Sequence, residues 1–267
     1  MDYRSVQNPP RAGAVCEKVE KSGKLCYARK SKNLREYFMK KLVIIPAYNE
    51  CGSIQRAVDD IREHAPGFDY VVINDCSTDS TLDICRKNNL NYVNLSVNLG
   101  IGGAVQTGYL YACQNGYDMA VQFDGDGQHD AAYLEMMAEE LVRTKSDMVI
   151  GSRFIEKEGF QSSGLRRAGI RYFSMLIRLL TGKRVTDPTS GMRIVNQDVM
   201  RIYAGSYPKD YPEPESVTAI LRMGKRVTEV PVVMRKREEG VSSIGGFRTV
   251  YYMIKVTLAI FMERLRG

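Results

Sequence analysis

Apolar segments rich in β-branched residues alternate along this chain with segments of helical spacing, and this alternation constrains the fold most. The expected strands are residues 42–45, 70–73, 91–95, 119–123 and 147–150. The expected helices are residues 53–64, 103–115 and 131–144, with a shorter one around 82–85. Strands separated by helices pair in parallel, because each connection has to cross over the sheet. We therefore expect an α/β fold with a mostly parallel, doubly wound sheet flanked by helices.

Polar clusters come directly after four of the expected strands. They are residues 48–50, 74–75, 98–100 and 124–128. In a parallel sheet, ligands bind beyond the carboxyl ends of the strands. The four clusters are therefore expected at one edge of the sheet, and their coincidence predicts a ligand site there.

Asp124 and Asp126 are the strongest candidates in these clusters. Two carboxylates one residue apart at the end of a strand can both reach one small, hard cation. Gly125 and Gly127 leave room for a bulky ligand, and Gln128 offers a further neutral oxygen. The alternative interpretation is an ordinary Asp-Gly turn after a strand.

The net charge of +7 raises the question of nucleic-acid binding. Residues 1–38 carry nine Lys/Arg residues and four acidic residues, which accounts for most of that charge. This segment has few apolar residues and no clear periodicity, so we expect a dispensable, disordered basic extension outside the fold. The aromatic residues of a single-strand binder are not grouped, so we expect no nucleic-acid partner.

The cysteines and histidines do not form the patterns of a zinc site or a disulfide framework. The six cysteines lack C-x-x-C spacing, so we expect the reduced thiols of a cytoplasmic protein. The beginning of the chain has no apolar stretch of the length that a secretory signal needs. The two histidines, His64 and His129, are expected at the surface.

Six motifs then occur in the order of a known family. They are residues 46–50, 74–79, 98–100, 123–126, 151–153 and 187–193. With these motifs the chain resembles the family 2 glycosyltransferases of the GT-A fold. The similarity is greatest to the branch of dolichol-phosphate mannose synthases and bacterial polyprenyl-phosphate sugar transferases. The resemblance covers about residues 40–244 and implies a GT-A, Rossmann-like domain, which we place at residues 39–246.

The resemblance implies that the first half of the chain binds a nucleotide sugar. Pro46, Tyr48 and Glu50 would border the nucleoside. Asp75 would accept hydrogen bonds from the base, and Gly100 belongs to a further donor-binding motif. The alternative for Asp75 is a helix-capping or turn-forming acid, and the alternative for Glu50 is a solvated loop acid.

The resemblance also gives the paired carboxylates a role. Asp124 and Asp126, with Gln128, would hold Mg²⁺ or Mn²⁺ on the donor's diphosphate. Asp124 would thereby bind the donor, and Asp126 would count as catalytic. Such a cation stabilises the leaving group without a proton.

The second half of the chain is expected to bind the acceptor. Residues 165–184 interleave six basic residues with apolar ones, which favours an amphipathic helix at a membrane surface. A helix packed on the sheet is the alternative. The resemblance implies that arginines here meet an acceptor phosphate, with Arg153, Arg166 and Arg167 as candidates and Arg153 also as a catalytic residue.

Glu213 and Glu215 lie in a proline-rich segment where relatives that glycosylate hydroxyl groups place their base. The two prolines predict a rigid turn. A sugar hydroxyl has to lose a proton as it attacks, so either acid could be a general base. A phosphate acceptor is already anionic, and the acids would then orient the donor. A structural turn with exposed acids is the remaining interpretation.

Two further segments complete the expected site. Arg237 and Ser242 belong to a basic, Gly/Ser-containing loop that is expected to close over the diphosphate. Residues 247–267 have helical spacing, but their longest uncharged run, 256–262, has seven residues, whereas a membrane span needs about twenty. We expect a C-terminal amphipathic helix that lies in the membrane interface, packs against a small membrane protein, or packs on the core.

Together these expectations describe a metal-dependent, inverting glycosyltransferase that is peripheral on the cytoplasmic face of the cell membrane and acts in cell-surface polysaccharide synthesis. The expected acceptor is polyprenyl (undecaprenyl) phosphate. The expected donor is UDP-GlcNAc or UDP-glucose, with GDP-mannose second. Two alternatives stay open: a transferase acting on a sugar hydroxyl of a lipid-linked saccharide, with Glu213 or Glu215 as base, and a non-catalytic, membrane-associated assembly subunit.

Overall fold

The fold is described by a computed structural model, which covers residues 39–156, 164–210, 212–235 and 253–258. The predicted extension, residues 1–38, lies outside the described residues, and so does most of the predicted C-terminal helix.

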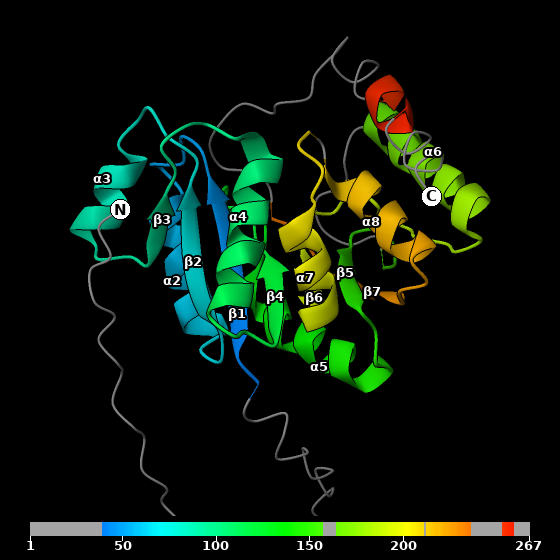
Figure 1. Ribbon diagram of the computed structural model, residues 1–267, viewed down its shortest axis with the longest axis horizontal. Helices are drawn as coiled ribbons and strands as arrows, with labels where there is room; N and C mark the ends of the chain where they lie inside the picture. The colour runs from blue at the N-terminus through cyan, green and yellow to red at the C-terminus, as the bar shows by residue number, and fades with distance from the viewer. Residues whose placement is uncertain (1–38, 157–163, 211, 236–252, 259–267) are drawn as a thin grey trace, which may run out of the picture. The chain divides into compact units, whose positions relative to one another are not determined.

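Seven strands form a sheet in the described part of the chain, in the order β3-β2-β1-β4-β6-β5-β7 (Figure 1). The strands are β1 (Lys41–Ala47), β2 (Asp69–Asn74), β3 (Tyr92–Asn94), β4 (Met119–Gln122), β5 (Met148–Ser152), β6 (Arg193–Asn196) and β7 (Val227–Pro231). Neighbouring strands are parallel except at β6, which runs antiparallel to both β4 and β5. The predicted mostly parallel α/β sheet is therefore confirmed, whereas β6 and β7 were not predicted.

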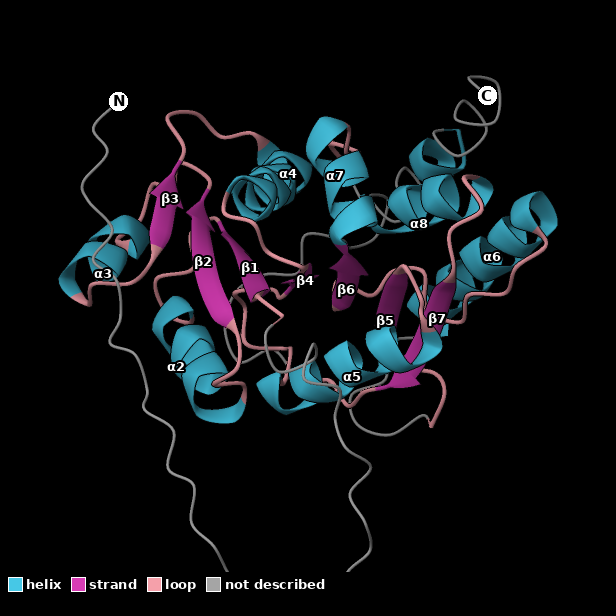
Figure 2. Cartoon of the chain, turned by 60° about the horizontal axis from the view of Figure 1, so that its bottom comes forward, coloured by secondary structure: helices cyan, strands magenta, loops and turns pink. Residues whose placement is uncertain are grey.

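Helices cover both faces of this sheet (Figure 2). They are α2 (Ile54–His64), α3 (Thr81–Lys87), α4 (Gly100–Gln114), α5 (Leu134–Thr144), α6 (Gly164–Thr181), α7 (Gln197–Gly205) and α8 (Pro212–Arg222). Buried side chains of α2 and α5 share one core, and those of α4, α7 and α8 share the other. The predicted helix 131–144 is interrupted, because its first three residues form a 3₁₀ turn before α5 begins.

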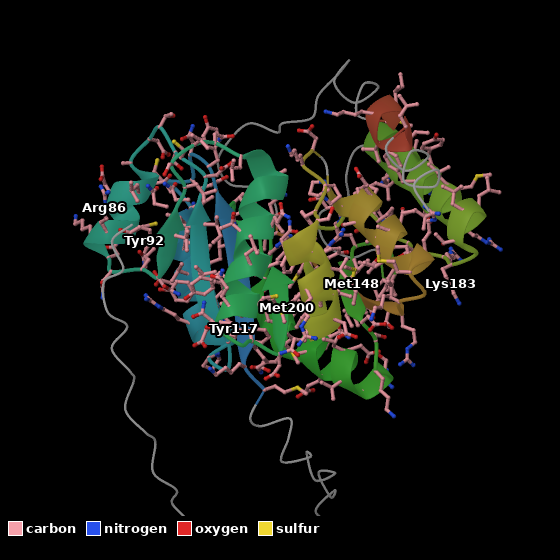
Figure 3. The ribbon with its side chains drawn as sticks, viewed as in Figure 1. Arg86, Tyr92, Tyr117, Met148, Lys183 and Met200 are labelled. Atoms are coloured by element: carbon pink, nitrogen blue, oxygen red, sulfur yellow. The ribbon has the colours of Figure 1, made fainter. Side chains whose placement is uncertain are left out.

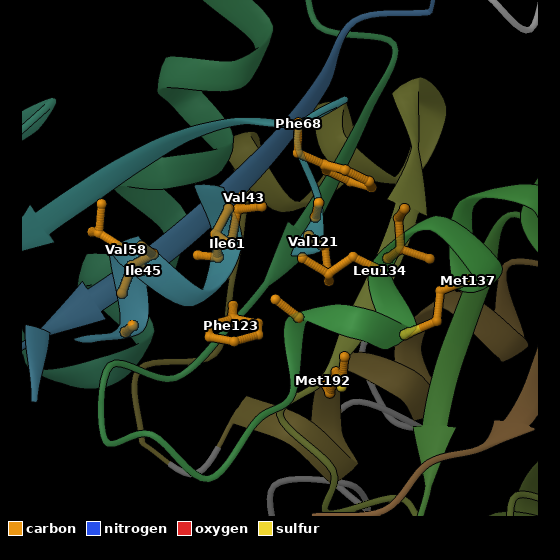
Figure 4. Close-up of a cluster of buried hydrophobic side chains, with 14 of the residues drawn as sticks. Val43, Ile45, Val58, Ile61, Phe68, Val121, Phe123, Leu134, Met137 and Met192 are labelled. Atoms are coloured by element: carbon orange, nitrogen blue, oxygen red, sulfur yellow. The ribbon is translucent and has the colours of Figure 1, made fainter. Parts of the chain in front are cut away.

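Alternate residues of the central strand β1 fill these two cores. Val43 and Ile45 pack in the core with α2 and α5 (Figure 4). Leu42 and Ile44 pack in the opposite core with α4 and α7. Successive side chains of a strand point to opposite faces. A strand that is buried on both faces therefore needs a continuous apolar run, as β1 has.

The second core extends across the sheet to the later strands. Met148 on β5 and Met200 on α7 are both fully buried in it, and Figure 3 labels both side chains. Tyr117 lies at its edge and donates a hydrogen bond to Asp69 Oδ2 at 3.0 Å. The two halves of the chain therefore share one hydrophobic core on this face.

A buried ion pair connects the end of β5 with the loop before β6. Arg153 donates from Nε to Asp187 Oδ2 and from Nη2 to Asp187 Oδ1, both at 2.7 Å. The two side chains are 8% and 0% exposed. Glu229 on β7 binds the same loop, accepting the backbone N–H of Thr186 at 2.7 Å and that of Asp187 at 2.9 Å. Side-chain contacts thus tie β5 and β7 to the loop that leads into β6.

Replacing Asp187 by Asn keeps the size of the side chain but leaves a buried guanidinium without its counter-charge. We expect Asp187→Asn to lower the free energy of unfolding by about 3–5 kcal/mol, measured by urea denaturation. The control is Arg143→Gln, because Arg143 is 72% exposed in its pair with Glu140. That exposed pair contributes about 1 kcal/mol or less. Equal losses in the two variants would contradict a stabilising role for the buried pair.

Helix α4 packs against β1 with no space for a side chain at Gly108. A Cβ atom at this position would lie 2.2 Å from Ile44 Cγ2. We expect Gly108→Ala to destabilise the protein by about 1–3 kcal/mol in the same denaturation measurement, because the core is overpacked. Gly205→Ala is the control, since a Cβ there meets nothing within 4 Å. The prediction fails if both variants unfold at the wild-type urea concentration.

Candidate active site

The carboxyl ends of β1, β2 and β4 bring the predicted polar clusters to one edge of the sheet. The Asp75 N–H donates to Ala47 O at 2.9 Å, which joins the loops that follow β2 and β1. The Asn49 N–H donates to Ser77 Oγ at 3.0 Å, and the Thr78 N–H donates to Asn49 Oδ1 at 2.8 Å. Asn49 has a left-handed backbone, with φ of 58°, which asparagine tolerates better than most residues. The first two clusters are thus one hydrogen-bonded unit.

Asp75 connects this unit with the third cluster. Its side chain is 3% exposed, and Oδ1 accepts the Leu99 N–H at 2.7 Å. Asn98 Nδ2 donates to the backbone oxygen of Asp75 at 3.1 Å. The carboxylate therefore holds the loop in front of α4, next to Gly100, where that helix begins. This loop-holding contact resembles the turn-forming alternative, and the contact of Asp75 with a nucleoside stays a prediction.

The predicted nucleoside-bordering residues differ in exposure. Pro46 is buried within β1, whereas Tyr48 beyond the strand is 48% exposed. Glu50 is partly buried, and its Oε2 accepts a hydrogen bond from Ser53 Oγ at 2.7 Å. Tyr48 therefore has the surface for a planar ligand, while Glu50 is engaged with the start of α2.

Asp124 lies two residues beyond the end of β4 and is held from several sides. Its N–H donates to His129 Nδ1 at 2.9 Å, and Gln122 Nε2 donates to its Oδ1 at 3.3 Å. His129 Nε2 lies 3.5 Å from Oδ2 of the same carboxylate. A Cβ atom at position 191 would lie 2.8 Å from that oxygen, so Gly191 leaves the space that the carboxylate occupies. The prediction that His129 is a surface residue is wrong, because the ring is 2% exposed and packs edge-on against Phe123.

Asp126 and Gln128 lie in the same loop. Asp126 Oδ1 accepts the Gln128 N–H at 3.0 Å, which folds the loop into a tight turn. The Gln128 backbone oxygen in turn accepts the Arg235 N–H at 2.9 Å. Arg235 also pairs with Asp130 at 3.1 Å, so the chain beyond β7 lies against this loop.

The oxygen atoms of this loop suit a divalent cation. The described residues contain no group of three or more His, Cys, Asp or Glu side chains arranged to hold a metal alone. Mg²⁺ and similar hard cations are commonly bound through one or two carboxylates together with substrate phosphates. The carboxylates of Asp124 and Asp126, with the amide oxygen of Gln128, fit a cation whose coordination a diphosphate completes.

The Arg153 guanidinium binds the Asp187 carboxylate. Its Nη2 also donates to Thr189 Oγ1 at 3.0 Å. Burial lowers the pKa of Arg153, but the hydrogen bonds and charge of Asp187 outweigh that effect and raise it, with smaller contributions from Asp124 and Glu213. The predicted contact of Arg153 with an acceptor phosphate therefore has to compete with an existing ion pair.

The other predicted phosphate-binding and loop residues are only partly described. Arg167 is exposed in the first turn of α6, and the side chain of Arg166 lies outside the described residues. Arg237 and Ser242 also lie outside them. Their roles stay predictions.

The two proline-flanked acids form the first turn of helix α8 rather than a turn between elements. Proline fits the first helical position, because it has no N–H that needs a partner there. Glu213 is partly buried. Burial raises the pKa of Glu213, the charge of Arg193 lowers it and the charge of Asp124 raises it, and the net effect is a raised pKa. Glu215 is in the same turn.

Arg193 was part of a predicted motif but not of the predicted site. It is fully buried at the start of β6, and its guanidinium donates to the backbone oxygens of Ser190 at 2.6 Å and of Glu213 at 3.0 Å. Its Nη1 also donates to Ser216 Oγ at 3.0 Å. Arg193 therefore fixes the start of α8 against the loop that passes Asp124. Its position in the 187–193 motif is the one feature of the sequence that indicates this role of Arg193.

The chain is similar to known proteins over most of its length. The family description "Glycosyl transferase family 2" matches residues 42–202, which is more than half of the chain. The undecaprenyl-phosphate mannosyltransferase of Micrococcus luteus is 32% identical over 241 residues, covering 86% of this chain and 98% of the relative. The UDP-N-acetylglucosamine–dolichyl-phosphate N-acetylglucosaminyltransferase of Methanococcus voltae is 29% identical over 246 residues, covering 83% and 97%.

A solved structure has the same fold. Glucosyl-3-phosphoglycerate synthase from Mycobacterium tuberculosis, in complex with Mn²⁺, UDP and phosphoglyceric acid, superposes with a TM-score of 0.63 at 19% identity. The match covers 86% of this chain and 79% of that one, which confirms the predicted GT-A fold. With the family match and the Micrococcus relative, the conclusion is that this chain belongs to glycosyl transferase family 2.

Proposed function

We propose that this protein is an inverting glycosyltransferase that moves a sugar from a nucleotide-sugar donor to polyprenyl phosphate. The observation that carries the proposal is the placement of Asp124 and Asp126 at the same sheet edge as Asp75, within a chain of this family. Relatives named for transfer to undecaprenyl and dolichyl phosphate support the acceptor. Their names include both mannose and N-acetylglucosamine, so GDP-mannose belongs beside UDP-GlcNAc and UDP-glucose in any donor panel.

A divalent cation, Mn²⁺ or Mg²⁺, is the proposed cofactor. Asp124, Asp126 and Gln128 would hold it, and the bound cation would neutralise the charge that develops on the departing diphosphate. The Mn²⁺ and UDP in the Mycobacterium tuberculosis structure support this choice by analogy of fold. Asp75, Tyr48 and the neighbouring loops would hold the nucleoside.

An acceptor phosphate is already an oxyanion, so its attack needs no general base. Glu213 would then limit where the sugar and the acceptor lie, because Arg193 holds the start of α8 against the loop that passes Asp124. Arg167, which is exposed, and Arg166 are proposed to draw the acceptor phosphate to the site. Arg153, with its fork held by Asp187, would contribute its positive charge.

Exposed apolar side chains on α6 support binding to a membrane surface. Tyr172, Met175 and Leu179 are 40%, 72% and 77% exposed and recur at helical spacing. A second helical segment, residues 253–258, packs on α6 through Val256 and exposes further apolar side chains. Exposed apolar side chains accompanied by basic residues are typical of helices that lie in the interface plane. We propose that the protein acts there, peripherally on the cytoplasmic face, whether or not a small membrane protein assists it.

No helix in the described ranges has the length and apolar character needed to cross a membrane.

Replacing Asp126 by Ala should lower sugar transfer at least about a hundredfold, because the leaving group loses its electrostatic stabilisation. The assay incubates purified protein, Mn²⁺, each nucleotide sugar and undecaprenyl phosphate, and detects the glycosylated lipid by mass spectrometry. The matched control is Asp83→Ala, since Asp83 on α3 is 77% exposed. It should retain wild-type transfer.

The same panel includes a lipid-linked saccharide as a second acceptor. Product from undecaprenyl phosphate supports the proposal, whereas product from the saccharide alone would favour transfer to a hydroxyl group with Glu213 or Glu215 as base. Wild-type protein that forms no product with any donor would contradict the proposed activity. Unchanged turnover in Asp126→Ala would contradict the metal assignment.

A charge on the exposed face of α6 should weaken membrane binding. We expect the double variant Met175→Glu and Leu179→Glu to lower the fraction of protein bound to anionic lipid vesicles at least about tenfold, as measured by co-sedimentation. The variant loses the burial of two apolar side chains in the membrane, and the anionic lipid repels the two new charges. Met223→Glu is the control, because Met223 is also exposed, at 55%, but lies beyond the end of α8. If the wild-type protein does not bind to vesicles that contain no other protein, direct membrane binding is contradicted.

A further inference from the structure

Gln122 is a buried polar side chain directly beneath the proposed site. It is the last residue of β4 and 1% exposed. The flanking residues Val121 and Phe123 belong to the core on the α2 side, so Gln122 points to the opposite face, where α4, α7 and α8 lie. A buried amide needs partners for its oxygen and for its two N–H groups.

Those partners come from both halves of the chain. Gln122 Nε2 donates to Asp124 Oδ1 at 3.3 Å, and Tyr207 Oη donates to Gln122 Oε1 at 3.5 Å. Gln122 also lowers the pKa of the Glu213 carboxyl group, against the larger, opposite effect of burial. One amide therefore joins the loop that follows β4 with Tyr207, which lies between α7 and α8.

The direction of the amide is set by these contacts. Burial raises the pKa of Tyr207 well above its usual value, so its hydroxyl group stays protonated and able to donate. In the reverse orientation the amide oxygen would face the Asp124 carboxylate, and two oxygen acceptors would meet without a proton between them. The arrangement that satisfies these groups has Tyr207 donating to Gln122, and Gln122 donating to Asp124.

The surroundings leave Asp124 little other freedom. Gly191 contacts its Oδ2 side so closely that a Cβ there would lie 2.8 Å away, and His129 accepts its N–H. Glu213 is fixed through its backbone oxygen, which accepts from Arg193 at 3.0 Å. Gln122 is thus the side chain that holds Oδ1 of the Asp124 carboxylate.

We propose that Gln122 is a positioning residue that holds the Asp124 carboxylate, with Tyr207 fixing the direction of its amide. The inference rests on the proposed function, since it concerns the acid that would bind a divalent cation on the donor. It links the end of β4, on the donor side, with the segment between α7 and α8 that carries Tyr207. Without Gln122, Oδ1 of Asp124 loses this donor, and the carboxylate is oriented less firmly toward the cation.

The test measures Mn²⁺ binding in the presence of UDP or GDP by isothermal titration calorimetry, on the full-length protein. Replacing Gln122 by Met keeps the length of the side chain but removes both N–H groups. We expect the Kd for Mn²⁺ to rise about 10–100-fold, the range seen when a partner that orients a metal ligand is removed. Tyr207→Phe removes one hydroxyl group and should raise the Kd in the same direction by less.

The matched control is Gln106→Met. Gln106 on α4 also donates one hydrogen bond, to Ala204 O at 3.2 Å, but it contacts neither acid in the described hydrogen bonds. Its Mn²⁺ affinity should equal that of the wild type. Thermal unfolding of each variant without ligand separates a loss of fold from a loss of positioning, and Tyr207→Phe keeps the test decisive if Gln122→Met unfolds.

Steady-state kinetics give a second readout. The concentration of Mn²⁺ that half-activates transfer should rise in Gln122→Met, while the KM for the lipid acceptor stays within about twofold. Wild-type Mn²⁺ affinity in both Gln122→Met and Tyr207→Phe would overturn the positioning role alone. Wild-type protein that binds no Mn²⁺ with either nucleotide would overturn the proposed cofactor and this inference together.

Discussion

The buried pair of Arg153 and Asp187 is the interaction on which the second half of the structure depends. It joins the end of β5 to the loop before β6, and Glu229 on β7 holds the same loop through its backbone N–H groups. Burying a guanidinium and a carboxylate removes their hydration, which costs free energy. The two parallel hydrogen bonds that Arg153 donates from Nε and Nη2 to Asp187 offset that cost. This loop places Gly191 and Arg193 at the edge of the sheet where Asp124 lies.

The antiparallel strand β6 brings the two halves of the chain into one site. Because β6 lies between β4 and β5, the residues before it reach the carboxyl end of β4. Gly191 gives the Asp124 carboxylate its space, and Arg193 binds the first turn of α8 with its buried guanidinium. The proposed donor side and acceptor side therefore share a single support. A substitution in the 187–193 loop acts on both.

Much of the fold could be predicted from the sequence as far as β5. Strands β1, β2, β4 and β5 contain runs of at least three apolar residues, and the helices between them have clear periodicity, so local pattern was enough. Strands β6 and β7 contain no such run, because polar residues flank the two central apolar residues of β6 and interrupt β7. The acids at 213 and 215 were expected in a turn because of their prolines, but proline also fits the first turn of a helix. His129 was misplaced at the surface, since its burial depends on Phe123 and on the N–H of Asp124.

The sequence by itself determined the α/β class, the edge of the sheet where the polar clusters meet, the closely spaced carboxylates Asp124 and Asp126, and the family. These depend on residues that are close along the chain, where spacing and backbone geometry decide. Only the tertiary structure decided that Arg153 faces Asp187, 34 positions away, and that Gln122 receives its hydrogen bond from Tyr207, 85 positions away. Such contacts depend on the order of strands in the sheet, and hydrophobic periodicity determines which face of a strand is buried but not which strand lies beside it.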